Sequence, residues 1–154
     1  MPIKPENRCR YPAQWPVLSR AAKERAGWRC VHEGCTARQY SVGRWMDVAG
    51  RPTWTPHADY AESYKDARQM AAEYSFFLFG DAPPPRGEPP VIVIVLTTAH
   101  LDHDPGNCAP ENLAPMCQRH HLAYDADHHA KTAYGTRMAQ RNNMELPLAL
   151  EGKG

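Results

Sequence analysis

The residues with the richest potential chemistry lie in two short stretches of the C-terminal half. They are Ala99-His-Leu-Asp-His-Asp104 and Pro110-Glu-Asn-Leu-Ala-Pro-Met-Cys-Gln-Arg-His-His121. An imidazole titrates near neutral pH and can accept a proton, and imidazole, thiolate and carboxylate groups are also metal ligands. The two stretches therefore combine the groups that metal binding and hydrolytic proton transfer require.

Four thiol and imidazole side chains have the spacing of a structural zinc site. Cys30 and Cys35 enclose a tight loop that contains a glycine, and Cys117-Gln-Arg-His120 supplies a second pair. Tetrahedral zinc accepts three thiolates and one imidazole, and its two ligand pairs can come from distant segments. We expect Zn2+ to join Cys30 and Cys35 to Cys117 and His120. His32 is a competing ligand, and the alternative is that Cys30 and Cys35 are buried small apolar side chains.

The elements that must position these groups follow from hydrophobic periodicity and from proline, glycine and capping residues. A β-branched run over residues 91–98 predicts a strand covered on both faces, which ends next to His100. A loop, a short extended segment over residues 112–116 and a helix that opens at Cys117 follow it. The other expected elements are a helix over residues 19–27, a strand over residues 42–48, a helix from Thr55-Pro56 to Phe79-Gly80 and a second C-terminal helix over residues 133–142.

The length of 154 residues corresponds to about one domain, so we expect a single domain of the mixed α+β class. Fifteen prolines and ten glycines indicate many irregular connections. The expected parts are a basic, proline-rich arm (1–16), a zinc-knuckle half with an inserted helix (17–80), a proline-rich connection (81–90), a strand-strand-helix core (91–131), and a helix with a tail (132–154).

The distribution of charge and the length of the apolar runs limit the kinds of molecule that the protein could bind. The formal net charge is only +1, but residues 1–44 hold nine Lys and Arg against three acidic groups. This segment could contact phosphates, and the alternative is a solvated arm. The apolar run Val91–Leu96 is too short to cross a bilayer, and the N-terminus has no apolar signal core. With five cysteines, an odd number, we expect a cytoplasmic protein without disulfides and without a membrane partner.

His100, Asn112 and His121 resemble the three signature residues of the HNH nuclease family. The run from Asn112 to His121 is similar to the family pattern N-L-x-x-x-C-x-x-C-H, with His120 in place of the second cysteine. The resemblance covers about residues 91–130 and implies a small zinc-stabilised ββα-metal core with flanking helices. It departs from the family at Ala99, where many members carry a metal-binding Asp or His.

The resemblance implies a metal-dependent endonuclease that hydrolyses DNA and leaves 5′-phosphate and 3′-hydroxyl ends. His100, at the end of a strand, is the expected general base, and Asn112 is expected to orient it. His121 and Asp125 lie four residues apart on one face of the predicted helix and could share Mg2+ or Mn2+. Asp102 is the natural replacement for the ligand missing at position 99.

A second alignment remains open around the first histidine. In it, Asp102-His103 supply the ligand and the base, and His100 becomes a metal ligand. Otherwise His103 is a contact to substrate or metal. His128 and His129 follow Asp125 by three and four residues, so they are secondary candidates for the same site.

Other functions fit the residues less well. A zinc-stabilised nucleic-acid or protein binding module without catalysis is the alternative that Ala99 favours. A zinc deaminase needs the motifs H-x-E and P-C-x-x-C, and a dithiol redox protein needs C-x-x-C; the sequence contains none of these. Nicking and double-strand cleavage are both compatible with the residues, as are roles in phage packaging, mobile-element transfer or host defence.

Overall fold

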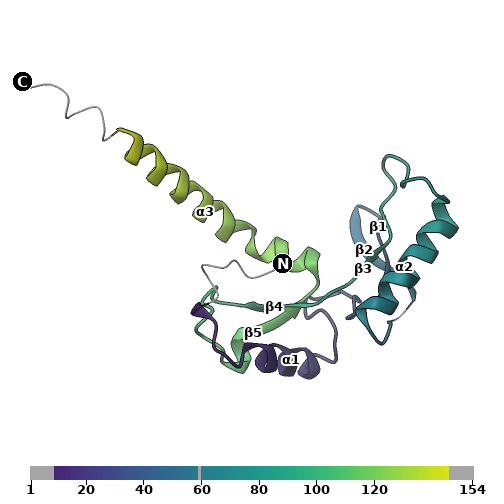
Figure 1. Cartoon of the computed structure of the whole chain (residues 1–154), viewed down its shortest axis with the longest axis horizontal. Coiled ribbons are helices and arrows are strands. Elements are labelled where there is room, and N and C mark those ends of the chain that lie inside the picture. The colour runs from purple at the N-terminus through teal and green to yellow at the C-terminus, as the bar shows by residue number, and fades with distance from the viewer. Residues whose placement is uncertain (1–8, 59, 146–154) are drawn as a thin grey trace, which may run out of the picture. The chain divides into compact units, whose positions relative to one another are not determined.

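The computed structural model describes residues 9–58 and 60–145, with the side chains of residues 129, 132, 140 and 142–145 outside the description. The chain divides after His121 into two compact units, and each is described by itself. The start of the expected N-terminal arm and most of the expected tail lie outside the described residues. The first unit mixes helices and strands, so the α+β class is confirmed (Figure 1).

A three-stranded antiparallel sheet forms one part of the first unit. Its strands are β1 (Val42–Val48), β2 (Arg51–Ala58) and β3 (Ile92–Val93), in the order β2-β1-β3. The strand predicted over residues 42–48 is confirmed. Helix α2 (Tyr64–Phe79) packs on this sheet, where Val42 and Ala67 are fully buried.

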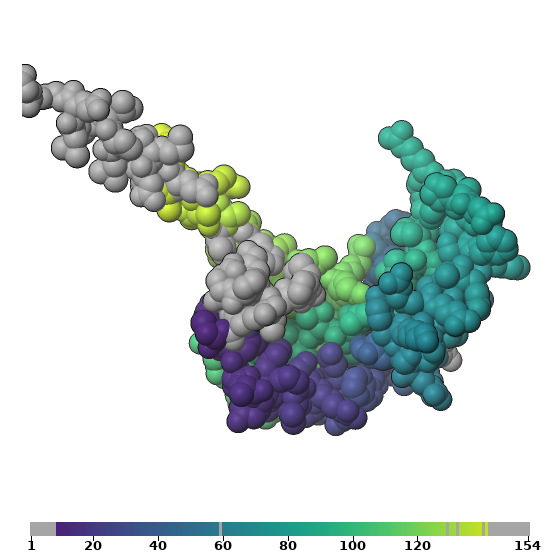
Figure 2. Space-filling model, in the orientation of Figure 1, coloured from purple at the N-terminus to yellow at the C-terminus, as the bar shows by residue number. Residues whose placement is uncertain are grey.

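A two-stranded antiparallel sheet forms the other part and carries the histidine stretch. It pairs β4 (Thr97–His100) with β5 (Leu113–Met116), and His100 lies opposite Leu113. Helix α1 (Trp15–Arg25) packs against both strands, and its purple surface covers one side of this part of the unit (Figure 2). The next element after β5 is helix α3 (Gln118–Glu145), so the predicted order of strand, loop, strand and helix is confirmed.

The apolar run over residues 91–98 does not form the single strand that its composition predicts. β3 pairs with β1, and the chain then crosses to the second sheet and begins β4. Ile94 and Leu96 lie at the crossing, 0% and 1% exposed. The Ile94 N–H donates to the Ser41 carbonyl oxygen at 2.9 Å, and the Leu96 N–H donates to Gln39 Oε1 at 2.6 Å. The apolar run is therefore buried because it connects two sheets, and not because it is a central strand of one sheet.

Helix α1 begins four residues before the predicted Ser19 cap. Pro16 occupies the first turn, where its missing N–H costs nothing, and the helix starts at Trp15. The Ser19 hydroxyl instead forms a hydrogen bond with the Thr98 hydroxyl at 2.9 Å and joins α1 to β4.

The predicted start of the second helix at Thr55-Pro56 is also wrong. Both residues belong to β2, an edge strand, which tolerates a proline without a backbone donor. The cap is Ser63, whose hydroxyl accepts the Asp66 N–H at 3.2 Å. The predicted end is confirmed, because the helix stops at Phe79 before Gly80, whose φ is 63°.

The C-terminal region is one helix, α3, where the sequence predicted two. Leu122, Tyr134 and Met138 are exposed along it. Most of the side chains that the structure describes along α3 are exposed, so burial imposes little apolar periodicity and the pattern fades although the helix continues. Residues 81–90 contain neither helix nor strand, as their prolines predict. None of the described helices is long and apolar enough to span a membrane.

Replacing Gly43 should destabilise the first unit. A Cβ at this position would collide with the Thr55 carbonyl oxygen and lie 2.8 Å from Pro56 Cα on the neighbouring strand. Gly43→Ala should lower the free energy of unfolding by about 1–3 kcal/mol in urea denaturation. Gly135→Ala is the matched control, because a Cβ there meets no atom within 4 Å and should stabilise α3 by about 0.5–1 kcal/mol. An unchanged urea midpoint for Gly43→Ala would contradict this packing.

Candidate metal centre and histidine loop

The four predicted zinc ligands come together in the first unit. One ligand atom from each of Cys30, Cys35, Cys117 and His120 lies within 4.8 Å of the others. His120 Nδ1 is 3.2 Å from Cys117 Sγ and 3.5 Å from Cys30 Sγ. Zinc bonds of about 2.3 Å to sulfur and 2.0–2.1 Å to nitrogen place tetrahedral ligand atoms about 3.6 Å apart. This donor set and spacing could hold a metal ion such as zinc.

Backbone hydrogen bonds bring the first two cysteines to the start of α3. The Cys30 N–H donates to the Ala37 carbonyl oxygen at 2.9 Å, and the Cys35 N–H donates to the His32 carbonyl oxygen at 3.0 Å. These bonds fold residues 30–37 into a compact loop. The Val31 N–H donates to the Pro115 carbonyl oxygen at 2.9 Å, so the loop is attached to β5, just before Cys117.

The three thiols of the cluster differ in how readily they ionise. Cys30 and Cys117 are 6% and 0% exposed. Hydrogen bonds from the Cys117 and Cys35 side chains lower the pKa of Cys30, which favours its thiolate. The hydrogen bonds with the Cys30 and Cys35 side chains raise the pKa of Cys117, and the pKa of Cys35 is raised as well. Cys30 is therefore the thiolate of the cluster, and a bound zinc ion would have to displace the protons of the other two thiols.

Aromatic rings hold the imidazole of His120 in place. His32 stacks on it with ring centroids 3.8 Å apart and an interplanar angle of 3°, and Trp45 meets it edge-on at 5.7 Å. His32 is therefore not a member of the four-residue cluster, although its spacing made it a competing ligand. The contribution of Trp45 was missed, because nothing in the spacing of β1 links it to a ligand far along the chain.

His100 lies at the end of β4 and is only 7% exposed. Trp15 stacks on its ring at 4.7 Å with an interplanar angle of 23°, and Tyr11 approaches edge-on at 5.8 Å. Burial lowers the pKa of His100, and the charges of Asp102 and Asp104 oppose this shift. The neutral imidazole, which can accept a proton, is thus favoured at neutral pH.

Asn112 joins the two ends of the loop that follows His100. Its Nδ2 donates to Asp102 Oδ1 at 2.9 Å and to the Asn107 carbonyl oxygen at 2.7 Å, and its Oδ1 accepts the Asp102 N–H at 3.1 Å. Asn112 is 8% exposed. Hydrogen bonds from Asn112, from the Asp104 N–H and from Asn107 lower the pKa of Asp102 to about 2. Asp102 is consequently a carboxylate at every pH near neutrality.

The remaining predicted site residues lie in the histidine loop and along α3. His103 follows in the loop with a φ of 60°, and its N–H donates to the His100 carbonyl oxygen at 3.0 Å. His121 is partly buried in the first turn of α3. Asp125, partly buried, and His128, exposed, belong to the second unit, and the side chain of His129 lies outside the description.

Among the described residues, the geometry supports a possible metal ion at the four-residue cluster and gives no such support to the predicted catalytic ion. Among the side chains that the structure describes, Cys30, Cys35, Cys117 and His120 are the one group of three or more potential ligands that close together. Asp102 and His121 belong to no second such group within the described residues.

The sequence did not predict two side chains that contact His100. Cys108, which the sequence left unassigned, has its Sγ 3.6 Å from His100 Nε2. Trp15 stacks on the His100 ring, and its only sequence signal is its position four residues after Tyr11, with which it forms a ring pair at 5.2 Å. No protein-family model matches the chain, and neither does any curated protein or solved structure.

Removing one thiol should release the metal ion. Cys117→Ser replaces a buried ligand of the cluster, so the purified variant should contain much less than one zinc per chain and unfold at a lower temperature. Cys108→Ser is the control because its thiol lies outside the cluster, and it should keep the metal. Elemental analysis and thermal unfolding give the two readouts. Full zinc occupancy in Cys117→Ser would remove this residue from the ligand set.

Losing the Asn112 side chain should loosen the histidine loop. Asn112→Ala removes three hydrogen bonds and leaves buried loop groups unpaired, which should cost about 1–3 kcal/mol of unfolding free energy. The Asp102 amide should exchange with solvent faster, because it loses its acceptor. The amide of Ile94, bonded to Ser41, is the internal control. Equal acceleration at both amides would indicate general destabilisation and contradict a local clamp.

Proposed function

We propose that this protein is a metal-dependent endonuclease of the HNH type that hydrolyses phosphodiester bonds in DNA. The observation that carries the proposal is the arrangement of the β4–β5 loop. A buried, neutral histidine ends the first strand, and the buried Asn112 side chain bridges the loop beside it. The next element after β5 is a helix that opens at the possible metal cluster. The resemblance of His100, Asn112 and His121 to the HNH signature fits this order of elements.

His100 is the proposed base in the reaction. Its imidazole takes a proton from water, and the water oxygen forms a bond to phosphorus. The bond from phosphorus to the 3′ oxygen breaks, and that oxygen takes up a proton, which leaves 5′-phosphate and 3′-hydroxyl ends. Trp15 and Tyr11 restrict the ring to one position, so the base is oriented before substrate arrives.

A divalent cation such as Mg2+ or Mn2+, when bound, would stabilise negative charge on the phosphate and the leaving oxygen. Asp102 and His121 are the candidate ligands from the first unit, and Asp102 is ionised because its pKa is about 2. Asp125 remains a candidate from its position four residues after His121 on α3.

Two exposed arginines at the histidine loop support DNA as the substrate. Arg10 lies 3.7 Å from Asp104 Oδ1, and Arg25 Nη2 donates to the Pro110 carbonyl oxygen at 2.7 Å. Both belong to the basic N-terminal segment. Guanidinium groups at the edge of the loop would contact backbone phosphates and place the strand near His100.

A second candidate function is a zinc-stabilised binding module without catalysis. Ala99 is 3% exposed and offers no ligand atom where many HNH members have one. In the described part of the chain, only the Cys30, Cys35, Cys117 and His120 group gathers ligands for a cation. DNA binding without cleavage in Mg2+, Mn2+ and other divalent ions would favour this function.

Mutation of His100 tests the proposed base. His100→Ala should reduce cleavage of supercoiled plasmid in Mg2+ or Mn2+ by about 100-fold or more, because it removes the proposed base. The matched control is His57→Ala, which removes a histidine stacked on Tyr74 at 3.5 Å and should retain full cleavage. Zinc content is measured for each variant to show that the fold is kept.

The outcome also separates the two alignments of the loop. If His100→Ala cleaves at the original rate while His103→Ala does not cleave, His103 is the base. If both variants cleave normally with intact zinc content, neither histidine is the base and the proposed mechanism is wrong.

A further inference from the structure

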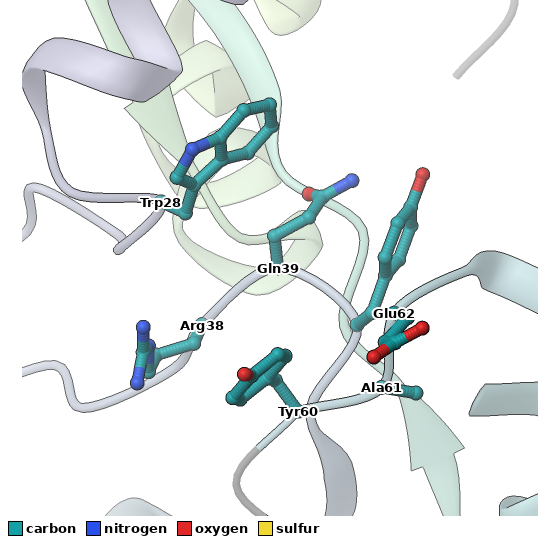
Figure 3. Close-up of a pocket in the computed structure, with 7 residues that line it drawn as sticks. Trp28, Arg38, Gln39, Tyr60, Ala61 and Glu62 are labelled. Carbon is teal, nitrogen blue, oxygen red and sulfur yellow. The ribbon is translucent and has the colours of Figure 1, made fainter. Parts of the chain in front are cut away.

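A concave site lies in the first unit, where the residues that flank the Cys30–Cys35 loop meet those just before α2. It is a pocket of about 340 Å³ (Figure 3). Its walls are aromatic, from Trp28, Tyr40 and Tyr60, and its polar groups come from Arg38, Gln39 and Glu62. None of these residues belongs to the metal cluster or to the histidine loop.

Two of the aromatic walls are held in an unfavourable backbone conformation. Trp28 has a φ of 56° and Tyr40 a φ of 60°, in the left-handed region that bulky side chains avoid. Such a conformation costs on the order of 1–3 kcal/mol per residue and persists where the surrounding structure enforces it, often at binding sites. Two strained aromatic residues in one pocket therefore point to a ligand that needs these rings.

The polar groups can recognise the edge of a planar ligand. Gln39 is 9% exposed, and its Oε1 accepts the Leu96 N–H at 2.6 Å, which fixes the amide and presents its NH2 group as a donor. Figure 3 shows Gln39 between Trp28 and Glu62. The exposed carboxylate of Glu62 supplies acceptors. The pocket thus combines a donor and acceptors with flat apolar walls.

One arginine of the pocket lining, Arg38, offers a positive charge for an anion. The residue opposite it in an antiparallel bridge, Arg29, is exposed and lies outside the lining. The Arg38 guanidinium lies 5.4 Å from the centre of the Tyr60 ring, and its Nε is buried without a hydrogen-bond partner among the described residues. A phosphate beside the pocket could pair with the Arg38 guanidinium.

We propose that this pocket binds one unstacked nucleobase, with an adjoining phosphate at Arg38. A nucleotide joins a planar aromatic face, hydrogen-bonding edges and an anion in one molecule, and each part has a counterpart here. The source of the base, a single-stranded or extruded nucleotide of the DNA substrate, rests on the proposed function. A free nucleotide offers the same chemistry.

The test measures binding of a short, labelled single-stranded oligodeoxynucleotide to the full zinc-loaded chain without added divalent ions. Tyr60→Ala, at a residue 59% exposed, should weaken binding about ten-fold, because base stacking on an aromatic ring is lost. Tyr134→Ala, at a tyrosine 61% exposed on α3, is the matched control and should bind as the unmodified chain does. Equal binding by Tyr60→Ala and the unmodified chain would overturn the proposal.

Abasic oligonucleotides show whether the base itself is recognised. An abasic version keeps the phosphates, so it should bind about ten-fold more weakly and be insensitive to Tyr60→Ala. Competition then identifies the source. Displacement by a deoxynucleoside monophosphate supports a free-nucleotide pocket, and binding of the oligonucleotide alone supports a strand pocket. Equal competition by deoxyribose 5-phosphate would show that only phosphate is bound, which contradicts base recognition.

Plasmid cleavage, measured separately, distinguishes failure of this inference from failure of the proposed function. Tyr60-dependent binding by a chain that never cleaves DNA keeps the pocket and rejects the nuclease. Cleavage by a chain whose oligonucleotide binding does not depend on Tyr60 keeps the nuclease and rejects the pocket.

Discussion

The contact between the Cys30–Cys35 loop and the Cys117–His120 turn is the interaction on which the first unit depends. It joins segments that are far apart in the sequence, and the Val31 to Pro115 hydrogen bond attaches the same loop to β5. Bringing such distant segments together costs conformational entropy. The sheets are short, so their pairing offsets only part of this cost. Structural zinc has an apparent binding free energy of about 10–16 kcal/mol in small peptides, enough to offset much of that cost.

The histidine loop depends on this scaffold for its position. β5 ends next to Cys117, so the cluster fixes the strand that pairs with β4 and carries Leu113 opposite His100. Asn112, just before β5, then holds the loop through Asp102 and the Asn107 carbonyl oxygen. The adjacent residues His120 and His121 have different roles in our account. His120 belongs to the metal cluster, and His121 is left for the proposed catalytic ion.

The sequence predicts the cluster because the spacing within each ligand pair is local and because three thiolates with one imidazole suit tetrahedral zinc, which can join distant pairs. It also predicts β1, the end of α2 and the order of elements around the histidine loop. It fails where tertiary context decides: Pro56 is accepted in β2 because that strand is at an edge, and residues 91–98 divide because two sheets share them. The pocket beside Arg38 has no signal in the sequence, because Trp28 and Tyr40 are not residue types that predict left-handed backbone.

X-ray absorption spectroscopy of the zinc-loaded chain tests the central claim most directly, because it reports the atoms bound to the metal. Our account predicts three sulfur ligands at about 2.3 Å and one nitrogen ligand at about 2.0–2.1 Å, from Cys30, Cys35, Cys117 and His120. A first shell with two or fewer sulfur atoms, or one made of oxygen and nitrogen, would contradict it. The scaffold proposed for the histidine loop would then need another source of stability.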